Sequence, residues 1–395
     1  MFRIKTFDQV NDSAQNAFCR EKYAVSDIQS EPHALVIGSE ELHEQDIPES
    51  VIAIARAGID VSNLPVEECS EKGIVIFNTP GINANAIKEL TVTAFVMASR
   101  KIAEAVSWVE SLENQDNISE VVEEAKSDFS GTEILGKTAG VIGLGEVGVL
   151  VANTLIDLGM KVKVYDPSMS DGSEYSLSYL AEHASTLDEV FASCDYVTLH
   201  LPECGEFRNL IDEELLSKAK PGMKLVNLCC RELVASEAVI DALGKEIVET
   251  YVTDFPREEF IGNPSVVCMP HLGDCTSECE ANSSVMACAQ LKDFLENGNI
   301  KNSFNYPDCV MKRSQNNRIC VLHLNMPSMI YRISSVFDEN NININEMISG
   351  SKGVYSYTLI DVNEKTELVK EKICSMEGVI SVRLIGAFAE QQSPC

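Results

Sequence analysis

Short apolar runs alternate with longer helical stretches in the N-terminal part of the chain. The runs HALVIGS (33–39), VIAIARAG (51–58) and GIVIFNTPG (73–81) are typical of buried strands. The stretch NANAIKELTVTAFVMASR (83–100) repeats its apolar positions at helical spacing, and the acidic stretch 111–129 predicts a solvated helix and loop. This alternation predicts an α/β architecture.

The middle of the chain continues the pattern. Residues 137–167 predict a strand, a glycine turn, a helix and a second strand. Four more apolar runs, separated by helical segments, predict further buried strands: CDYVTLHLP (194–202), KLVNLCC (224–230), VETYVTDFP (248–256) and SVVCMPH (265–271). Such an order is typical of a doubly wound parallel sheet.

The pattern of apolar and polar positions changes in the C-terminal part. Residues 305–317, NYPDCVMKRSQNN, are polar and predict a linker. After them we expect a β-α-β-β-α-β order, which is that of ferredoxin-like domains. The expected elements are a strand (318–325), a helix (328–341), two strands (344–351 and 354–362), a helix (367–377) and a strand (379–386). We therefore predict a small independent domain at this end.

Composition excludes several partners. The 395 residues carry a formal net charge of −30, which disfavours binding to nucleic acid or to anionic membranes. The N-terminal MFRIKTFDQV lacks the apolar segment of a signal peptide, and no apolar run is long enough to span a bilayer. Fourteen cysteines without an export signal favour reduced thiols in the cytoplasm. Any anionic substrate must be bound by locally placed Arg and Lys side chains.

A glycine turn predicts a dinucleotide site. Gly143, Gly145 and Gly148 form G-x-G-x-x-G between a strand and a helix, and the next strand ends in Asp166. We expect Gly143 to permit the turn, Gly145 to admit a pyrophosphate and Gly148 to allow close packing of helix on strand. Asp166 would bind the ribose hydroxyls of NAD and repel the 2′-phosphate of NADP. The residues between the glycines, Glu146 and Val147, belong to the same predicted site.

The stretch VVCMPHLGDCTSEC has two interpretations. Cys268, His271, Cys275 and Cys279 have the local appearance of zinc ligands. Alternatively, His271 follows a buried strand of a doubly wound sheet, where such folds place their ligands, and its neighbouring cysteines are incidental. We favour the second interpretation and predict no metal.

The order of motifs resembles the D-isomer-specific 2-hydroxyacid dehydrogenase family over residues 35–300. The motifs are the glycine turn, HLP with His200, NLCCREL with Arg231, TDFPREE with Asp254, and PHLG with His271. The resemblance implies that Arg231 binds the substrate carboxylate, that His271 is the acid/base, and that Asp254 contacts the nicotinamide amide. It also implies a glutamate partner for His271. We favour Glu259, and Glu258 is the alternative.

The resemblance also implies a domain organisation. We predict a flavodoxin-like substrate-binding domain formed by residues 1–82 and 281–312, and a Rossmann-type NAD-binding domain over residues 83–280. Residues 317–395 resemble an ACT domain, a regulatory module that binds amino acids. The family implies a homodimer or homotetramer in which the cofactor domain supplies the usual dimer contact.

Other positions concern the substrate and the effector. Arg56, Asn83, Asn85 and Lys88 resemble the positions with which family members that oxidise D-3-phosphoglycerate, the first step toward serine, bind their substrate. His323, Asn325 and Asn343 resemble an amino-acid effector site. The chain departs from the family pattern with Asp60 in the carboxylate-binding loop, Asp274 and Cys275 after the histidine, and Ser328 where a glycine is usual.

Three functions remain open. The resemblance favours oxidation of D-3-phosphoglycerate by NAD, with hydride leaving C2 and His271 taking the hydroxyl proton. The alternatives are a dehydrogenase or reductase for another D-2-hydroxyacid, such as glycerate, hydroxypyruvate or lactate, and a non-catalytic NAD-sensing protein. Retention of Arg231, Glu259 and His271 argues against the last of these.

Overall fold

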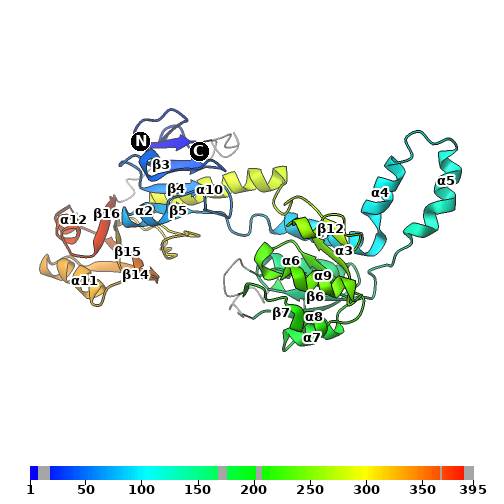
Figure 1. Cartoon of the computed structure of the whole chain (residues 1–395). Coiled ribbons are helices and arrows are strands. Elements are labelled where there is room, and N and C mark those ends of the chain that lie inside the picture. Colours follow the sequence, from blue (N-terminus) through cyan, green and yellow to red (C-terminus); the bar gives the residue numbers. More distant parts are fainter. Residues whose placement is uncertain (8–17, 168–175, 202–206, 365–366, 387–395) are drawn as a thin grey trace. The chain divides into compact units, whose positions relative to one another are not determined.

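The computed structural model describes residues 1–7, 18–167, 176–201, 207–364 and 367–386 (Figure 1). The chain forms two compact units. The first comprises residues 1–82 and 277–395, and the second comprises residues 83–276. Within the described residues, no helix is both long and apolar enough to cross a membrane.

A five-stranded parallel sheet begins the first unit. Its strands follow the order β2-β1-β3-β4-β5, which is the flavodoxin-like order that we predicted. The elements are β1 (Phe2–Thr6), β2 (Tyr23–Ser26), β3 (Ala34–Ile37), a 3₁₀ turn (Glu44–Asp46), β4 (Ala53–Arg56), α2 (Val66–Glu71), β5 (Val75–Phe77) and α10 (Ser277–Asn297). Alternate side chains face opposite sides: Val36 packs in the same core as α10, whereas Leu35 packs in the core on the other face.

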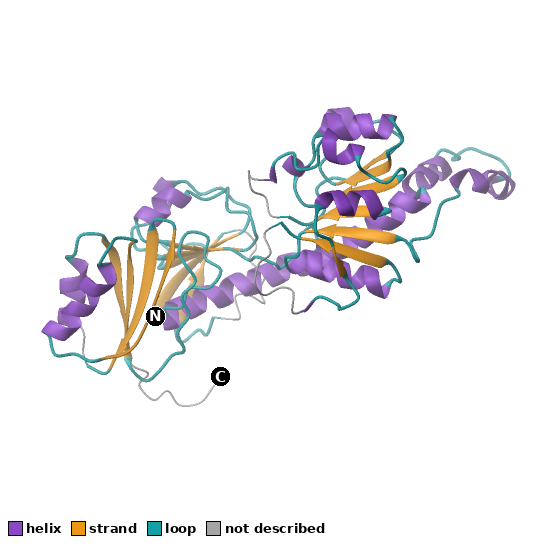
Figure 2. Ribbon diagram, turned by 90° about the horizontal axis from the view of Figure 1, so that it is seen from below, coloured by secondary structure: helices purple, strands orange, loops and turns teal. Residues whose placement is uncertain are grey.

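A four-stranded antiparallel sheet ends the same unit, with strand order β14-β15-β13-β16. Its elements are β13 (Asn317–Leu324), α11 (Met329–Glu339), β14 (Ile344–Lys352), β15 (Tyr355–Val362), α12 (Glu367–Cys374) and β16 (Val379–Ile385). This is the predicted ferredoxin-like order, which is also that of ACT domains. Both helices cover one face of the sheet, which is orange to red in Figure 1 and is also visible in Figure 2.

The other face of this sheet is not free. Its side chains Cys320, Leu322, Tyr357 and Leu359 belong to the same buried core as the N-terminal parallel sheet and α10. The segment 305–317, predicted to be a linker, is packed: Tyr306, Cys309 and Met311 are buried there, and the Tyr306 hydroxyl donates to the Ser70 carbonyl. The linker interpretation was wrong because the apolar residues in this polar stretch lie too irregularly to give a periodic signal.

The second unit is built on a seven-stranded sheet with the order β12-β11-β10-β9-β6-β7-β8. All of its pairings are parallel, as expected for a doubly wound Rossmann-type sheet. Its strands are β6 (Thr138–Ile142), β7 (Lys161–Tyr165), β8 (Glu182–His183), β9 (Tyr196–Leu199), β10 (Met223–Asn227), β11 (Val248–Thr253) and β12 (Val266–Cys268). This order confirms the predicted fold.

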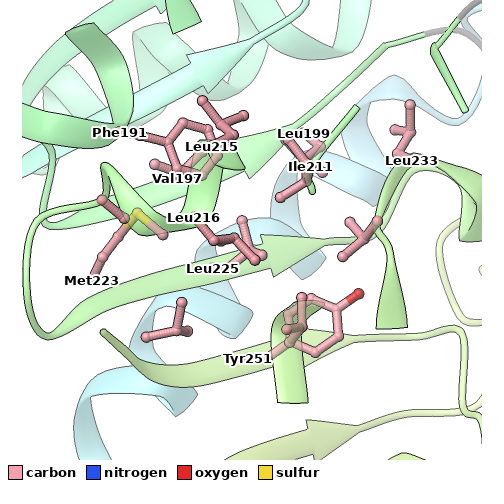
Figure 3. Close-up of a cluster of buried hydrophobic side chains, with 14 of the residues drawn as sticks. Phe191, Val197, Leu199, Ile211, Leu215, Leu216, Met223, Leu225, Leu233 and Tyr251 are labelled. Atoms are coloured by element: carbon pink, nitrogen blue, oxygen red, sulfur yellow. The ribbon is translucent and has the colours of Figure 1, made fainter. Parts of the chain in front are cut away.

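Helices cover both faces of that sheet. They are α3 (Ala84–Arg100), α6 (Glu146–Asp157), α7 (Leu187–Ser193), α8 (Glu213–Ser217) and α9 (Ser236–Gly244), with 3₁₀ turns at Arg231–Leu233 and Glu258–Phe260. One core contains side chains of α3 and α6, and the other contains side chains of α7, α8 and α9. Figure 3 shows the second core, where Phe191 and Leu215 pack over Val197 and Leu225 of the sheet. These two cores fix the strand ends that carry the predicted chemistry.

Two helices form an arm that contributes no core. They are α4 (Ile102–Glu110) and α5 (Ile118–Ala125), followed by a 3₁₀ turn (Lys126–Phe129), and no residue of either helix is buried. Both helices extend away from the sheet of their own unit (Figures 1 and 2). α5 matches the helix predicted within the acidic stretch 111–129, whereas α4 precedes that stretch and was not predicted.

Candidate functional site

The glycine turn has the geometry that its sequence predicts. A Cβ on Gly143, whose φ is 94°, would lie 2.4 Å from the His200 carbonyl oxygen, and a Cβ on Gly148 would lie 1.9 Å from the Gly143 oxygen. Only glycine fits either position without displacing backbone. A Cβ on Gly145 would instead enter open space at the N-terminus of α6. This is where a pyrophosphate would approach, so the turn fits a dinucleotide.

Asp166 and Glu146 lie at the same turn. The Asp166 carboxylate follows β7 and accepts a hydrogen bond from the Leu144 N–H at 2.7 Å, so it lies beside the glycine turn as predicted for a ribose ligand. Glu146 is the first residue of α6 and is exposed, and Val147 beside it is half-buried. The turn therefore carries two carboxylates, one of which contacts the backbone of the turn.

His200 packs against the glycine turn through its backbone. Its backbone N–H donates to the Ile142 carbonyl, and its Nε2 lies 3.1 Å from the Thr198 hydroxyl. Burial lowers the pKa of its imidazole to about 3, so the ring is neutral at physiological pH. His200 thus contributes backbone and shape to the cofactor side, but no charge. The proline of the predicted HLP motif lies outside the described residues.

Asp254 is a buried carboxylate at the sheet edge. It follows β11 and is completely buried, and its Oδ2 accepts hydrogen bonds from the Leu272 and Gly273 N–H groups, each at 3.2 Å. Its Oδ1 is buried without a partner in the described part of the chain. Burial raises the pKa of this carboxyl, while His271 and the two N–H groups act in the opposite direction. The unpartnered oxygen suits an amide donor such as that of nicotinamide.

Through those two N–H groups, Asp254 also holds the loop that begins with His271. The imidazole is exposed, and its ring centroid lies 5.0 Å from that of Phe255. Neither Glu258 nor Glu259, which are both exposed in the 3₁₀ turn, makes a hydrogen bond or ion pair with it in this structure. The structure brings His271 to Asp254 and Phe255, and the predicted glutamate pairing stays a prediction, with its two candidates open.

Arg231 completes the edge. It begins the 3₁₀ turn after β10 with an exposed side chain, and its carbonyl accepts a hydrogen bond from the Arg257 guanidinium at 3.0 Å. Gly143, Asp166, His200, Arg231, Asp254 and His271 follow the ends of β6, β7, β9, β10, β11 and β12. Because these strands are parallel and adjacent, their carboxyl ends form one edge. One edge therefore carries a dinucleotide turn, an exposed guanidinium and an exposed imidazole.

The zinc interpretation finds no support in the described ranges, where no three His, Cys, Asp or Glu side chains converge as metal ligands. Cys268 lies in β12, Cys275 is exposed in the following loop, and Cys279 is buried in α10. No disulfide joins any of the cysteines that the structure describes.

The predicted substrate residues belong to both units. Arg56 ends β4 in the first unit: its Nη1 donates to the Ala57 carbonyl at 3.1 Å, and its Nε is buried without a partner among the described residues. The Asp60 carboxylate accepts from the N–H and hydroxyl of Ser62. These hydrogen bonds, together with the charge of Arg56, lower the pKa of Asp60. The aspartate thus helps to shape the loop.

Asn83, Asn85 and Lys88 lie at the start of α3 in the second unit. Asn83 is the N-cap of that helix. The Lys88 ammonium donates to Asn85 Oδ1 at 2.6 Å and lies 3.9 Å from Glu89. A phosphate would have to compete with these partners for Lys88.

The predicted effector residues do not converge within one chain. The His323 ring is buried, with its nitrogens 2.8 Å from the Leu324 carbonyl and 2.9 Å from the Thr358 hydroxyl. Asn325 follows the end of β13, whereas Asn343 precedes β14 at the opposite end of the sheet. Ser328 adopts a left-handed φ of 64°, a conformation that favours the glycine usual in the family.

Sequence reasoning missed three features of these sites. They are the clamp of Asp254 on the loop of His271, the contact of Phe255 with that histidine, and a buried pair of Arg318 with Asp361. The first and last depend on partners 18 or more positions away, so no local pattern reports them. The only local signal was the position of Phe255 beside Asp254 in TDFPREE.

Comparisons with known proteins agree with this geometry. Residues 92–273 match the NAD binding domain of the D-isomer specific 2-hydroxyacid dehydrogenases. Hydroxypyruvate reductase of Thermotoga maritima is 32% identical over 272 residues, which are 66% of this chain and 84% of that protein. D-3-phosphoglycerate dehydrogenase of Mycobacterium leprae is 34% identical over 233 residues, which are 58% of this chain and 42% of that protein. The chain thus spans less than half of the mycobacterial relative.

A solved structure shows the same fold. The NAD⁺-bound 3-phosphoglycerate dehydrogenase of Entamoeba histolytica superimposes with a TM-score of 0.57 at 24% identity. The superposition covers 77% of this chain and 98% of that one. At this identity the likeness concerns the fold alone.

Proposed function

Because the chain belongs to the D-isomer specific 2-hydroxyacid dehydrogenase family, we propose that it oxidises a D-2-hydroxyacid with NAD, and that D-3-phosphoglycerate is its substrate. The observation that carries the proposal is one sheet edge with an open glycine turn, a buried unpartnered Asp254 oxygen and an exposed His271. Several curated relatives, including that of Mycobacterium leprae, bear the name D-3-phosphoglycerate dehydrogenase.

Each residue has a defined role in this proposal. The hydride from C2 of the substrate would go to the nicotinamide that a bound NAD would supply at this edge. Arg231 binds the substrate carboxylate, for which a planar, permanently charged guanidinium is suited. His271 takes the hydroxyl proton and releases it to solvent, since its ring is exposed. Asp254 holds the loop of His271 through Leu272 and Gly273 and offers its other oxygen to the nicotinamide amide. Glu259, or Glu258, would pair with the histidine.

Phosphate recognition rests on the remaining cations. With a net charge of −30, the protein attracts a phosphorylated acid only through local positive groups. Arg56 is the first candidate because its Nε has no partner in the described part of the chain, and Lys88 with Asn83 and Asn85 is the second. A second candidate function is reduction of hydroxypyruvate to D-glycerate. It is favoured by the relative from Thermotoga maritima and by the bonds of Lys88 to its own neighbours.

We expect NADH formation to distinguish these functions. Purified protein with NAD is offered D-3-phosphoglycerate, D-glycerate or D-lactate. His271→Ala should lower the rate about a hundredfold or more, because it removes the acid/base. His183→Ala, an exposed histidine of the same sheet, should leave the rate unchanged. A rate with the unphosphorylated acids alone would overturn the phosphoglycerate assignment. Bound NAD without any turnover would favour the sensing protein.

The same proposal includes a cytoplasmic homodimer. The arm of α4 and α5 supports the dimer, because neither helix has a buried residue. Four apolar side chains on these helices are 40–52% exposed: Ile102, Val106, Val109 and Ile118. Sedimentation equilibrium should give a dimer or a dimer of dimers. Charged substitution of both Val106 and Val109 should yield monomer, whereas Glu104→Gln on the same helix should not.

A further inference from the structure

A cavity of about 590 Å³ lies within the first unit, where the end of β14 meets the loops that follow β5 and α10. Its lining consists of Asn78, Pro80, Asn302, Ser303, Phe304, Pro307, Asp308, Gly350, Ser351 and Lys352. β14 packs closely against the segment that contains Pro307 and Asp308, since a Cβ on Gly350 would lie 3.2 Å from the Pro307 Cβ and from the Asp308 carbonyl oxygen. None of these residues takes part in the proposed chemistry.

The cavity contains one cation and one carboxylate, and each retains bonding capacity. The Lys352 ammonium donates to the Ser303 carbonyl at 2.9 Å, which leaves two of its three hydrogens without an acceptor among the described residues. Asp308 accepts the Asn302 N–H at 2.9 Å with one oxygen, and its other oxygen has no hydrogen bond to any described residue. Both side chains are exposed, so a ligand can reach them, and a ligand that carries both charges can pair with the two.

The other lining groups extend the same pattern. The Asn302 side-chain amide has no hydrogen-bond partner in the described part of the chain, so it offers both a donor and an acceptor. The Phe304 ring is 45% exposed and gives the cavity an apolar wall, with the Lys352 ammonium 5.9 Å from its centroid. A small molecule with two opposite charges and a short side chain offers a partner to each kind of group in this lining.

The cavity wall is also bonded to the substrate loop. The Asn78 amide donates to the Ile59 carbonyl at 2.8 Å, and the Thr79 N–H donates to the Gly58 carbonyl at 3.0 Å. Gly58 and Ile59 belong to the loop between Arg56 and Asp60. A molecule that contacts Asn78 therefore touches a residue that fixes the shape of that loop.

We propose that this cavity is a regulatory site for a free amino acid, with the ligand carboxylate on Lys352 and its ammonium on Asp308. The bound molecule changes the hydrogen bond that the Asn78 amide donates to the Ile59 carbonyl of the substrate loop. The site is formed by one chain alone and is separate from His323, Asn325 and Asn343. The regulatory effect rests on the proposed dehydrogenase activity, whereas the binding does not.

Calorimetric titration of the full chain tests the binding. Each of the common L-amino acids is titrated singly, with acetate and ethylammonium as probes that carry one charge only. At least one amino acid should saturate the protein, and neither single-charge probe should bind comparably. Lys352→Met and Asp308→Asn, which keep the size of the side chains, should each weaken binding about tenfold or more. Lys301→Met, an exposed lysine that does not line the cavity, should not.

The outcomes separate the alternatives. Failure of every amino acid to bind the unaltered chain overturns the proposal, as does binding that survives both Lys352→Met and Asp308→Asn. In an assay of the hydroxyacid, saturating ligand should change KM at least about twofold in the unaltered chain and not in Lys352→Met. Unchanged KM with intact binding refutes the link to the substrate loop. Because the titration contains no substrate, its result is independent of the proposed activity.

Discussion

Two completely buried aspartates of this chain have opposite surroundings. In the C-terminal sheet, Asp361 accepts hydrogen bonds from Arg318 Nε at 2.7 Å, from Arg318 Nη2 at 3.0 Å and from the Ser314 hydroxyl at 2.8 Å. At the edge of the other unit's sheet, Asp254 accepts, from the described residues, only two N–H bonds with one oxygen and has no bonded cation among them. A buried charge is costly unless it is paired. We therefore expect the paired aspartate to hold structure and Asp254 to serve a ligand.

The partner of Asp361 shows what the paired group holds. Arg318 also donates to the carbonyls of Asn297 at 2.8 Å, Met311 at 2.9 Å and Lys312 at 3.0 Å. These carbonyls belong to the end of α10 and to the segment that follows it. Arg383 donates to the Phe294 and Leu295 carbonyls of the same helix end. The C-terminal sheet therefore caps α10, and the last domain is joined to the first sheet by polar bonds as well as by core packing.

The largest effect is expected from Arg318→Met. Removing one member of a buried ion pair leaves Asp361 charged and unpaired, so the free energy of unfolding should fall by about 3–5 kcal/mol. Hydrogen exchange of the β13 and β15 amides, followed by mass spectrometry, measures the loss locally. The double change Arg318→Met with Asp361→Leu should recover part of it, since no isolated charge remains. A loss below about 1 kcal/mol in the single variant would mean that the pair is not structural.

Asp254→Asn tests the other half of the comparison. Affinity for NAD should fall about tenfold or more, because the amide group cannot reproduce both the acceptor for nicotinamide and the two loop bonds. Stability should not fall at neutral pH. Burial raises the pKa of Asp254, so the folded state binds its proton more tightly than the unfolded chain does. The contribution of Asp254 to the free energy of unfolding therefore decreases as pH rises from about 4, the unfolded pKa, through the folded pKa.

In Asp254→Asn that decrease should be absent, and the variant should be the more stable one above the folded pKa. Thermal unfolding between about pH 4 and pH 7 gives the slope, and calorimetric titration gives the NAD affinity. The comparison breaks down if the variant is less stable at neutral pH while its NAD affinity is unchanged. Asp254 would then be a structural group like Asp361.

The same contrast explains how much the sequence could reveal. The glycine turn and the strands around it were predictable because G-x-G-x-x-G, the preceding apolar run and Asp166 all lie within about thirty positions. The parallel, doubly wound character of the sheet followed from the alternation of these strands with helices, but their order did not. The first two strands, β1 and β2, were not predicted, because FRIKT and YAVS are short and mix polar with apolar residues.

The rest depended on distant partners. An arginine within NRICVLHL gives no sign that its side chain is fully buried, since its carboxylate lies 43 positions further along the chain. The backbone N–H groups that engage Asp254 lie 18 and 19 positions away, in a loop without periodicity. Nor could residues 305–317 be recognised as packed, because Tyr306 and Met311 find their neighbours only after the two sheets have formed.

Glu146→Gln should give the smallest effect and extends the comparison to an exposed carboxylate. Glu146 is solvated, so its charge is screened and requires no partner. At the first position of α6 it stabilises the helix dipole, yet it stands where the pyrophosphate of NAD is expected and repels it. Removing the charge should tighten NAD binding about two- to fivefold at low salt, with the gain shrinking as ionic strength rises. Calorimetric titrations at two salt concentrations measure this. Weaker binding in the variant would instead assign Glu146 a direct hydrogen bond to the cofactor. The exposed carboxylate of Glu146 would then serve the ligand, as we propose for the buried carboxylate of Asp254.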